Sequence, residues 1–133
     1  MLGKIHFYAG IGVVLIFLYT GYYMRHYFGE LFETDMMNRA LFRAGHLYIL
    51  SVGLINAALG AHFQISNTRV VKTVQRIGSV VIFMATFLII YGFFKEFPTE
   101  QIERPITQNA LYLILLGVSI HGLIYLWKNN KAS

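Results

Sequence analysis

Four long apolar stretches, separated by short charged segments, dominate this chain. They cover residues 5–24, 44–63, 77–94 and 106–127. Each is close to the roughly 20 residues that an α-helix needs to cross about 30 Å of hydrocarbon. A membrane-spanning strand would need only about 10 residues of alternating polarity, and these stretches do not alternate. The pattern therefore predicts an all-α membrane protein with four transmembrane helices.

The composition agrees with this class, because 56% of the residues are hydrophobic and only 13% are charged. Soluble domains carry about twice that charged fraction. The stretches are joined by short segments without repeats or low-complexity tracts. We therefore expect one domain over residues 1–133, folded as an up-down bundle of four helices.

The segment between the first two stretches, roughly residues 25–43, mixes bulky apolar side chains with charged ones. Tyr27, Phe28, Leu31 and Phe32 lie among acids and arginines. This composition is typical of an amphipathic segment at the membrane interface. We expect a short interfacial element there, between the first and second helices.

The charges differ between the two sides of the predicted bundle. The side with both termini holds only basic residues, namely Lys4, Arg69, Lys72, Arg76, Lys128 and Lys131. The opposite side holds Arg25, Arg39, Arg43, Lys95 and Arg104 together with all six acids. Short, purely basic segments favour the cytoplasmic face. We expect an inner-membrane protein with both termini in the cytoplasm. The basic residues form no continuous face, so nucleic acid is not an expected partner.

The five histidines are the candidates for chemistry within the membrane, because the chain has no cysteine and no carboxylate lies within an apolar stretch. A b-type haem takes two imidazoles from different helices, as in small membrane cytochromes. His6 on the first stretch and His121 on the fourth form the candidate pair. Gly10 and Gly117, each one turn away, are the candidates for clearance around a flat cofactor.

The expected depths of these two histidines in the membrane differ, which argues against the pair. At about 1.5 Å per residue, His6 lies about 3 Å beyond Lys4, whereas His121 lies about 9 Å inside Trp127. Because helical side chains tilt toward the N-terminus, the mismatch widens in antiparallel helices. Only a slanted haem would bridge the two.

Arg39, Arg43 and His46 follow one another at spacings of four and three, so they share a helix face at the outer end of the second stretch. We expect this polar outer cluster to form ion pairs with acids of the flanking loops. The alternatives are an anion or lipid-headgroup site and a proton-sensitive latch. Near mid-span, Asn56 is expected to hydrogen-bond to Thr86 on the third helix.

Small residues recur on the second and third stretches, at Gly45, Gly53, Asn56 and Gly60 and at Gly78, Ala85 and Gly92. Such stripes let helices pack closely inside the bundle or against a partner. If the stripe on the second stretch faces inward, His46 points into the bundle and His62 points toward lipid headgroups.

Three functional classes follow. The leading one is an accessory or structural membrane subunit that acts by helix packing, with itself as a homo-oligomer or within a larger membrane complex. The second is a b-haem electron carrier, and the third a small dimeric transporter or channel. An enzymatic role is not expected, because no nucleophile lies beside a base and no paired carboxylates occur within a span; an oxidoreductase role through haem is the only route left open. No metal site is predicted either, since Met24, Met36, Met37 and His26 lack regular ligand spacing for copper(I).

Overall fold

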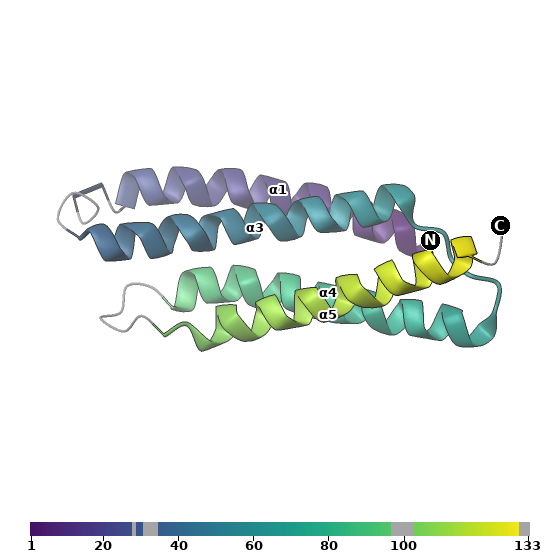
Figure 1. Cartoon of the computed structure of the whole chain (residues 1–133). Coiled ribbons are helices and arrows are strands. Elements are labelled where there is room, and N and C mark those ends of the chain that lie inside the picture. Colours follow the sequence, from purple (N-terminus) through teal and green to yellow (C-terminus); the bar gives the residue numbers. More distant parts are fainter. Residues whose placement is uncertain (28, 31–34, 97–102, 131–133) are drawn as a thin grey trace.

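The computed structural model describes residues 1–27, 29–30, 35–96 and 103–130. Four long helices make up the fold: α1 (Leu2–Tyr27), α3 (Met36–His62), α4 (Arg69–Lys95) and α5 (Pro105–Asn130). Figure 1 shows α1 lying beside α3 and α4 lying beside α5. Both chain ends lie at the same end of the molecule, which we call the terminal end, and the opposite end is called the loop end.

All four helices are long and apolar enough to cross a membrane. Large apolar side chains are exposed along their outer faces, among them Leu15, Leu18, Phe87, Leu115 and Leu123. A surface of this kind is suited to lipid rather than water. The predicted class, a small all-helical protein of membrane type, agrees with these features.

Each helix extends beyond the apolar stretch that predicted it, because caps set the ends of a helix whereas apolarity marks only its central part. Asp35 is the N-cap of α3, and its carboxylate accepts a hydrogen bond from the Asn38 backbone N–H at 3.0 Å. Residues 36–43 therefore form the first turns of α3. The expected separate interfacial element is wrong for this part, while residues 28 and 31–34 of the segment lie outside the described residues.

The start of α4 differs from the prediction in the same way. The helix begins at Arg69 rather than near residue 77. The buried Gln75 side chain holds the preceding segment in place: it accepts from the Ser66 N–H at 2.9 Å and donates to the Gln64 carbonyl at 3.0 Å. These bonds satisfy backbone groups that the turn between α3 and α4 would otherwise leave open.

The start of α5 is fixed by a carboxylate. Glu96 accepts hydrogen bonds from the backbone N–H groups of Ile106 and Thr107 at 2.5 and 3.1 Å. An acidic side chain in this position satisfies open donors and complements the positive end of the helix dipole. Pro105 is the first residue of the helix, a position that proline favours because a residue there needs no N–H.

Two pairs of helices touch through glycines. A Cβ at Gly10 would overlap the backbone of Ala57, so α1 and α3 meet backbone to backbone. A Cβ at Gly117 would lie 2.5 Å from Cγ1 of Ile82, so α5 presses closely on α4. Residues of the two predicted small-residue stripes are buried between helices of the same chain, including Gly53, Asn56, Gly78, Ala85 and Gly92.

Candidate functional site

Polar side chains from all four helices gather in the half of the bundle nearer the terminal end. His6 comes from α1, Asn56 from α3, Thr86 and Ser79 from α4, and His121 from α5. His6 and Asn56 are fully buried, at 0% exposure, and only His121 is partly exposed. Burying this many polar side chains costs free energy unless each of them is hydrogen-bonded. Their hydrogen bonds are therefore described one by one.

The chain of hydrogen bonds starts on α4. Thr86 donates its hydroxyl proton to the Ile82 carbonyl at 2.8 Å, so its oxygen accepts from the Asn56 amide at 2.9 Å. The predicted bond between Asn56 and Thr86 is therefore confirmed. The same Asn56 nitrogen donates to the Val52 carbonyl at 2.9 Å. The amide oxygen of Asn56 is left to accept, and it lies 2.8 Å from Nδ1 of His6.

These hydrogen bonds fix the tautomer of His6. Because Asn56 offers an acceptor, Nδ1 of His6 carries a proton, and in the neutral imidazole Nε2 then carries the lone pair. Nε2 is buried and has no hydrogen-bond partner among the described residues. Histidines that ligate metals use the same arrangement, with one nitrogen held by a hydrogen bond and the other free to coordinate.

His121 lies next to this imidazole. The two ring centroids are 6.4 Å apart, and the ring planes meet at 83°. Nε2 of His121 is 3.3 Å from the Ser79 hydroxyl. Gly78 makes room for the ring, since a Cβ there would lie 3.1 Å from the same nitrogen. The expected difference in depth does not keep the two histidines apart.

Two phenylalanines flank the histidines. Phe83 stacks on His6 with a centroid distance of 4.3 Å and an interplanar angle of 15°. Phe63, at the C-cap of α3, lies 6.0 Å from His6 and 5.5 Å from His121. Both aromatic rings pack against the buried imidazole of His6.

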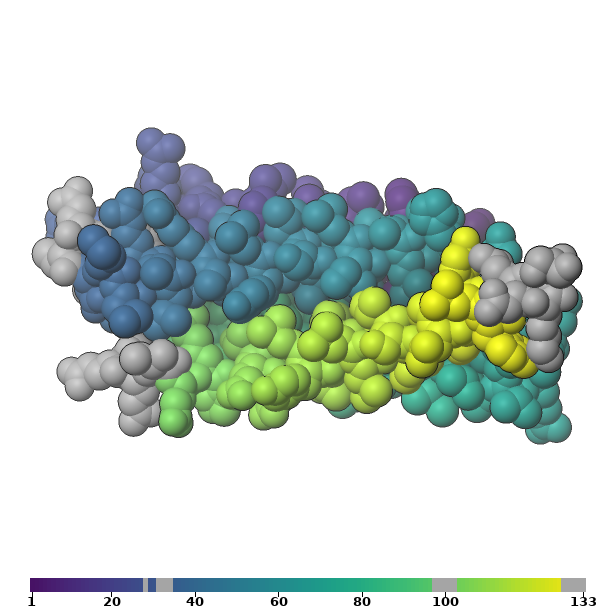
Figure 2. Space-filling model, viewed as in Figure 1, coloured from purple at the N-terminus to yellow at the C-terminus, as the bar shows by residue number. Residues whose placement is uncertain are grey.

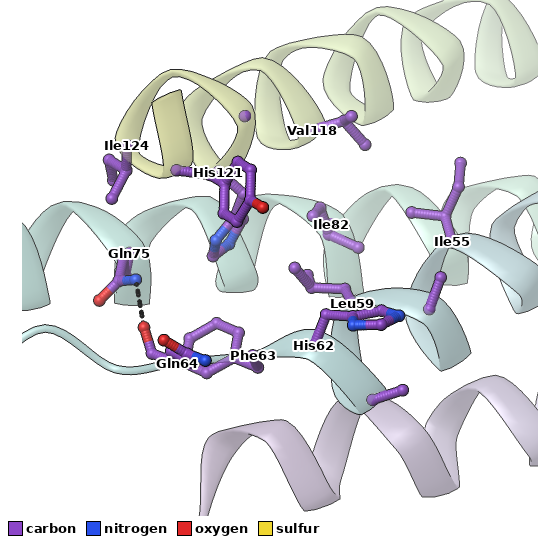
Figure 3. A pocket seen from close by; sticks show the side chains of 14 residues that line it. Ile55, Leu59, His62, Phe63, Gln64, Gln75, Ile82, Val118, His121 and Ile124 are labelled. Atoms are coloured by element: carbon purple, nitrogen blue, oxygen red, sulfur yellow. Dashed lines mark hydrogen bonds between the residues drawn. The ribbon is translucent and has the colours of Figure 1, made fainter. Parts of the chain in front are cut away.

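A cavity of about 630 Å³ opens beside His121. Figure 3 shows His121 projecting from α5 toward α4, with Phe63, Gln64 and Gln75 on the adjacent side. Apolar residues of α3, α4 and α5 form the deeper wall, including Leu59 and Ile82. The volume falls in the range of small-molecule and cofactor sites, about 300–1,000 Å³.

The candidate clearance residues leave no room for a cofactor, and the second histidine of α3 lies at the cavity rather than inside the bundle. The space beside Gly10 and Gly117 is occupied by atoms of the neighbouring helix, as described above. His62 is exposed at the end of α3 and lines the cavity. His26 is exposed at the end of α1, where its ring lies 4.2 Å from that of Tyr22.

The structure does not bring the polar outer cluster together as a buried group. Arg39 and Arg43 are exposed, whereas His46 is half-buried against α1. The His46 ring stacks on Phe17 at 4.0 Å, and its Nδ1 lies 3.0 Å from the Thr20 hydroxyl. Of the acids expected to pair with these cations, Glu33 and Glu100 lie outside the described residues.

Within the part of the chain that the structure describes, no group of three or more His, Asp or Glu side chains is placed to hold a metal ion. The two neighbouring imidazoles are fewer protein ligands than a structural zinc ion or a calcium ion takes.

Ser79 of this site and Arg104 at the loop end were not among the sequence candidates. Ser79 sits one residue after Gly78 on the buried face of α4. Arg104 precedes α5 and donates from Nη1 to the Leu41 carbonyl of α3 at 3.0 Å. Burial lowers the pKa of Arg104 from its usual value, and the nearby Glu96 carboxylate opposes that shift. The position of Arg104 beside Pro105 gave no sequence signal beyond that of a loop cation.

The chain has no match among protein-family models, among curated proteins or among solved structures. Function is therefore argued from the site alone.

Proposed function

We propose that this protein is a small haem protein of the inner membrane that binds a b-type haem between His6 and His121 and carries single electrons. In this proposal both termini lie in the cytoplasm, and the four helices cross the bilayer. The observation that carries the proposal is the buried Nε2 of His6, which has a lone pair and no partner among the described residues.

The separation of the two imidazoles supports the pairing. An imidazole nitrogen lies about 2 Å from the metal that it ligates, which sets two trans rings about 6 Å apart between their centres. The rings of His6 and His121 are 6.4 Å apart. The bond from Ser79 to His121 is long at 3.3 Å, so exchanging it for a coordinate bond costs little.

Space is available on one side of the pair. The cavity of about 630 Å³ borders His121 and Phe63, and Phe63 in turn lies beside His6. Rotation of Phe63 toward the cavity would expose His6 to the same space. The apolar wall formed by α3, α4 and α5 suits the face of a porphyrin, and Gln64 and Gln75 lie toward the terminal end, where polar substituents would be accommodated.

The roles of the chain's own residues follow from these contacts. His6 and His121 provide ligands from helices at opposite ends of the sequence, Asn56 holds the proton on Nδ1 of His6, and Phe83 excludes water from that ring. A bound b-type haem would supply one-electron redox chemistry. Burial of its ligands in an apolar bundle would tune the reduction potential.

The accessory role, acting through helix packing, is the alternative proposal. It accounts for the glycines, but Gly10 and Gly117 are already in contact with helices of the same chain. It gives no reason for leaving Nε2 of His6 buried without a partner, an arrangement that costs free energy in a purely structural core. The haem proposal accounts for the unpartnered nitrogen, and packing within the chain accounts for the glycines.

The proposal is tested by expressing the chain with haem supplied, purifying it in detergent, and recording absorption spectra before and after dithionite reduction. We expect a Soret band that shifts on reduction, and one haem per chain by the pyridine haemochromogen assay. His6→Ala and His121→Ala should each abolish the low-spin spectrum.

The matched control is His62→Ala, which removes an exposed histidine that also lines the cavity. This variant should retain the spectrum of the wild type. A colourless wild-type preparation that also fails to take up added haemin would refute the haem proposal, and equal loss in His62→Ala would refute the assigned ligand pair.

A further inference from the structure

A second cavity, of about 350 Å³, lies at the loop end between α3 and α5. It is lined by Ala44 and Tyr48 of α3, by Thr107 and Leu111 of α5, and by the charged pair Glu103 and Arg104. The cavity beside His121 also lies largely between α3 and α5. α3 packs against α1 and α4, and α5 packs against α4, but α3 and α5 make little direct contact.

The two cavities thus lie at opposite ends of the surface between α3 and α5, which we call the groove. Figure 2 shows this face of the molecule, with α3 in blue and teal lying along α5 in green and yellow. The lining residues recur at helical spacing, through residues 41, 44, 48, 55 and 59 on α3 and residues 104, 107, 111, 118 and 122 on α5. Apolar side chains, among them Leu41, Ile55, Leu111 and Val118, line both cavities and suit an acyl chain.

Arg104 gives the loop end of the groove its polarity. One guanidinium nitrogen donates to the Leu41 carbonyl, while Nε is buried and has no partner within the described residues. A guanidinium has five N–H donors in a fork that fits phosphate oxygens. The buried donor therefore lies at the edge of a cavity that has room for an anionic group.

The acids around Arg104 define which anion fits. Both carboxylate oxygens of Glu96 accept hydrogen bonds from the first turn of α5, and the carboxylate also interacts electrostatically with the nearby Arg104 guanidinium. Glu103 is exposed and lines the same cavity. A ligand with a phosphate for Arg104 and a cationic group for Glu103 would match both charges, whereas a purely anionic ligand would be repelled by Glu103.

We propose that the groove between α3 and α5 is a binding site for a zwitterionic phospholipid of the ethanolamine type. Its phosphate is held by Arg104, its ammonium group faces Glu103, and an acyl chain lies along the groove toward the centre of the bundle. The proposal rests on the membrane location proposed above and does not depend on haem.

The test uses the full chain in detergent, delipidated by extensive washing. Phosphatidylethanolamine, phosphatidylglycerol and diacylglycerol with identical acyl chains are added separately, and retained lipid is measured by native mass spectrometry together with the midpoint of thermal unfolding. We expect retention and a raised midpoint with phosphatidylethanolamine, on the order of tenfold weaker binding of phosphatidylglycerol, and none of diacylglycerol. Inorganic phosphate should give no shift.

Three variants locate the site. Arg104→Gln should lose retention of phosphatidylethanolamine, and Glu103→Gln should remove the preference over phosphatidylglycerol. Ala44→Leu, which narrows the cavity without altering a charge, should also weaken retention and keeps the test decisive if Arg104→Gln does not fold. Arg43→Gln, which removes an exposed cation at the same end of α3, is the matched control and should behave as the wild type.

Several results would overturn the proposal. Equal retention of diacylglycerol would mean an apolar groove without a headgroup site, and a shift with inorganic phosphate of the same size would mean a free-anion site. Stronger binding of phosphatidylglycerol would refute the zwitterionic headgroup. Retention that survives both Arg104→Gln and Ala44→Leu would place the lipid elsewhere. None of these outcomes bears on the absorption spectrum that tests haem binding.

Discussion

Nδ1 of His6 donates a hydrogen bond to the side-chain oxygen of Asn56 over 2.8 Å, and both residues are fully buried. This bond joins α1 to α3 and decides which nitrogen of His6 carries the lone pair. This buried polar pair therefore both holds the two helices together and determines which imidazole nitrogen can bind a ligand. Changes to Asn56 should therefore affect stability and cofactor binding together.

Asn56→Leu should destabilise the protein by about 2–3 kcal/mol, because it leaves the N–H of His6 buried without an acceptor and removes the donor to Thr86. In the haem-loaded protein, the same change should weaken haem binding by about 10–100-fold, as is typical for loss of a hydrogen bond to a ligating histidine. Thermal unfolding in detergent and haemin titration measure the two effects.

Ser51→Ala is the control for this variant. Ser51 lies on the same helix but is exposed and donates only to the Leu47 carbonyl within α3. Its loss should change stability by less than about 0.5 kcal/mol and leave haem affinity unchanged. An Asn56→Leu protein with the wild-type affinity for haem would show that Asn56 does not position His6.

Gly10→Ala should separate α1 from α3, because the added methyl group overlaps the backbone of Ala57. Overpacking of this kind costs about 1–3 kcal/mol. Gly12→Ala is the matched control on the same helix: nothing lies within 4 Å of its Cβ position, so it should be neutral or stabilising by up to about 1 kcal/mol. Equal midpoints of thermal unfolding for the two variants would contradict the close contact between α1 and α3.

The helices of this fold could be predicted from sequence, and their ends could not. Runs of apolar residues identify the parts suited to hydrocarbon, but the helix termini depend on single side chains such as Asp35 and Glu96, which bind backbone N–H groups. Pro105 is a sequence signal for the start of α5, because proline is favoured in the first turn of a helix.

His6 and His121 lie close together, as a candidate ligand pair must, but their relative depth could not be predicted from the sequence. The depth comparison took Lys4 and Trp127 as markers of one level, whereas α5 continues to Asn130 and the helix ends are staggered. The groove residue Arg104 was missed, since a cation beside a loop proline gives no sign of burial. Its environment depends on the packing of α3 and α5 against α4, which no local pattern encodes.

Glu96→Ala should release the first turn of α5, because it removes the acceptor for the N–H groups of Ile106 and Thr107 and for the Thr107 hydroxyl. Hydrogen bonds to a charged acceptor contribute about 1.5–3 kcal/mol, so a loss of about 2 kcal/mol is expected. Faster amide hydrogen exchange at Ile106 and Thr107 would report the change. Lys95→Ala, at the exposed neighbouring position, should leave exchange at both amides unchanged; equal acceleration would exclude Glu96 as the cap.

Acid should loosen the start of α3 through Asp35. The Asn38 backbone N–H, followed by its side-chain amide, holds the pKa of this carboxyl below its usual 3.8. Because the folded-state pKa is lowered, the cap stabilises the helix at pH values above the unfolded pKa and is lost as the pH falls below about 4. Nuclear magnetic resonance of the Asn38 amide across the acid range measures this transition.

The Asn38 amide signal should titrate with a midpoint below 3.8, the usual pKa of an aspartate. Asp35→Asn keeps an N-cap acceptor but has no ionisable group, so its Asn38 signal should stay constant over the same range. A wild-type midpoint at or above 3.8 would show that the Asn38 N–H does not hold the carboxylate in solution. A titration that persists in Asp35→Asn would assign the transition to another acid near the loop end.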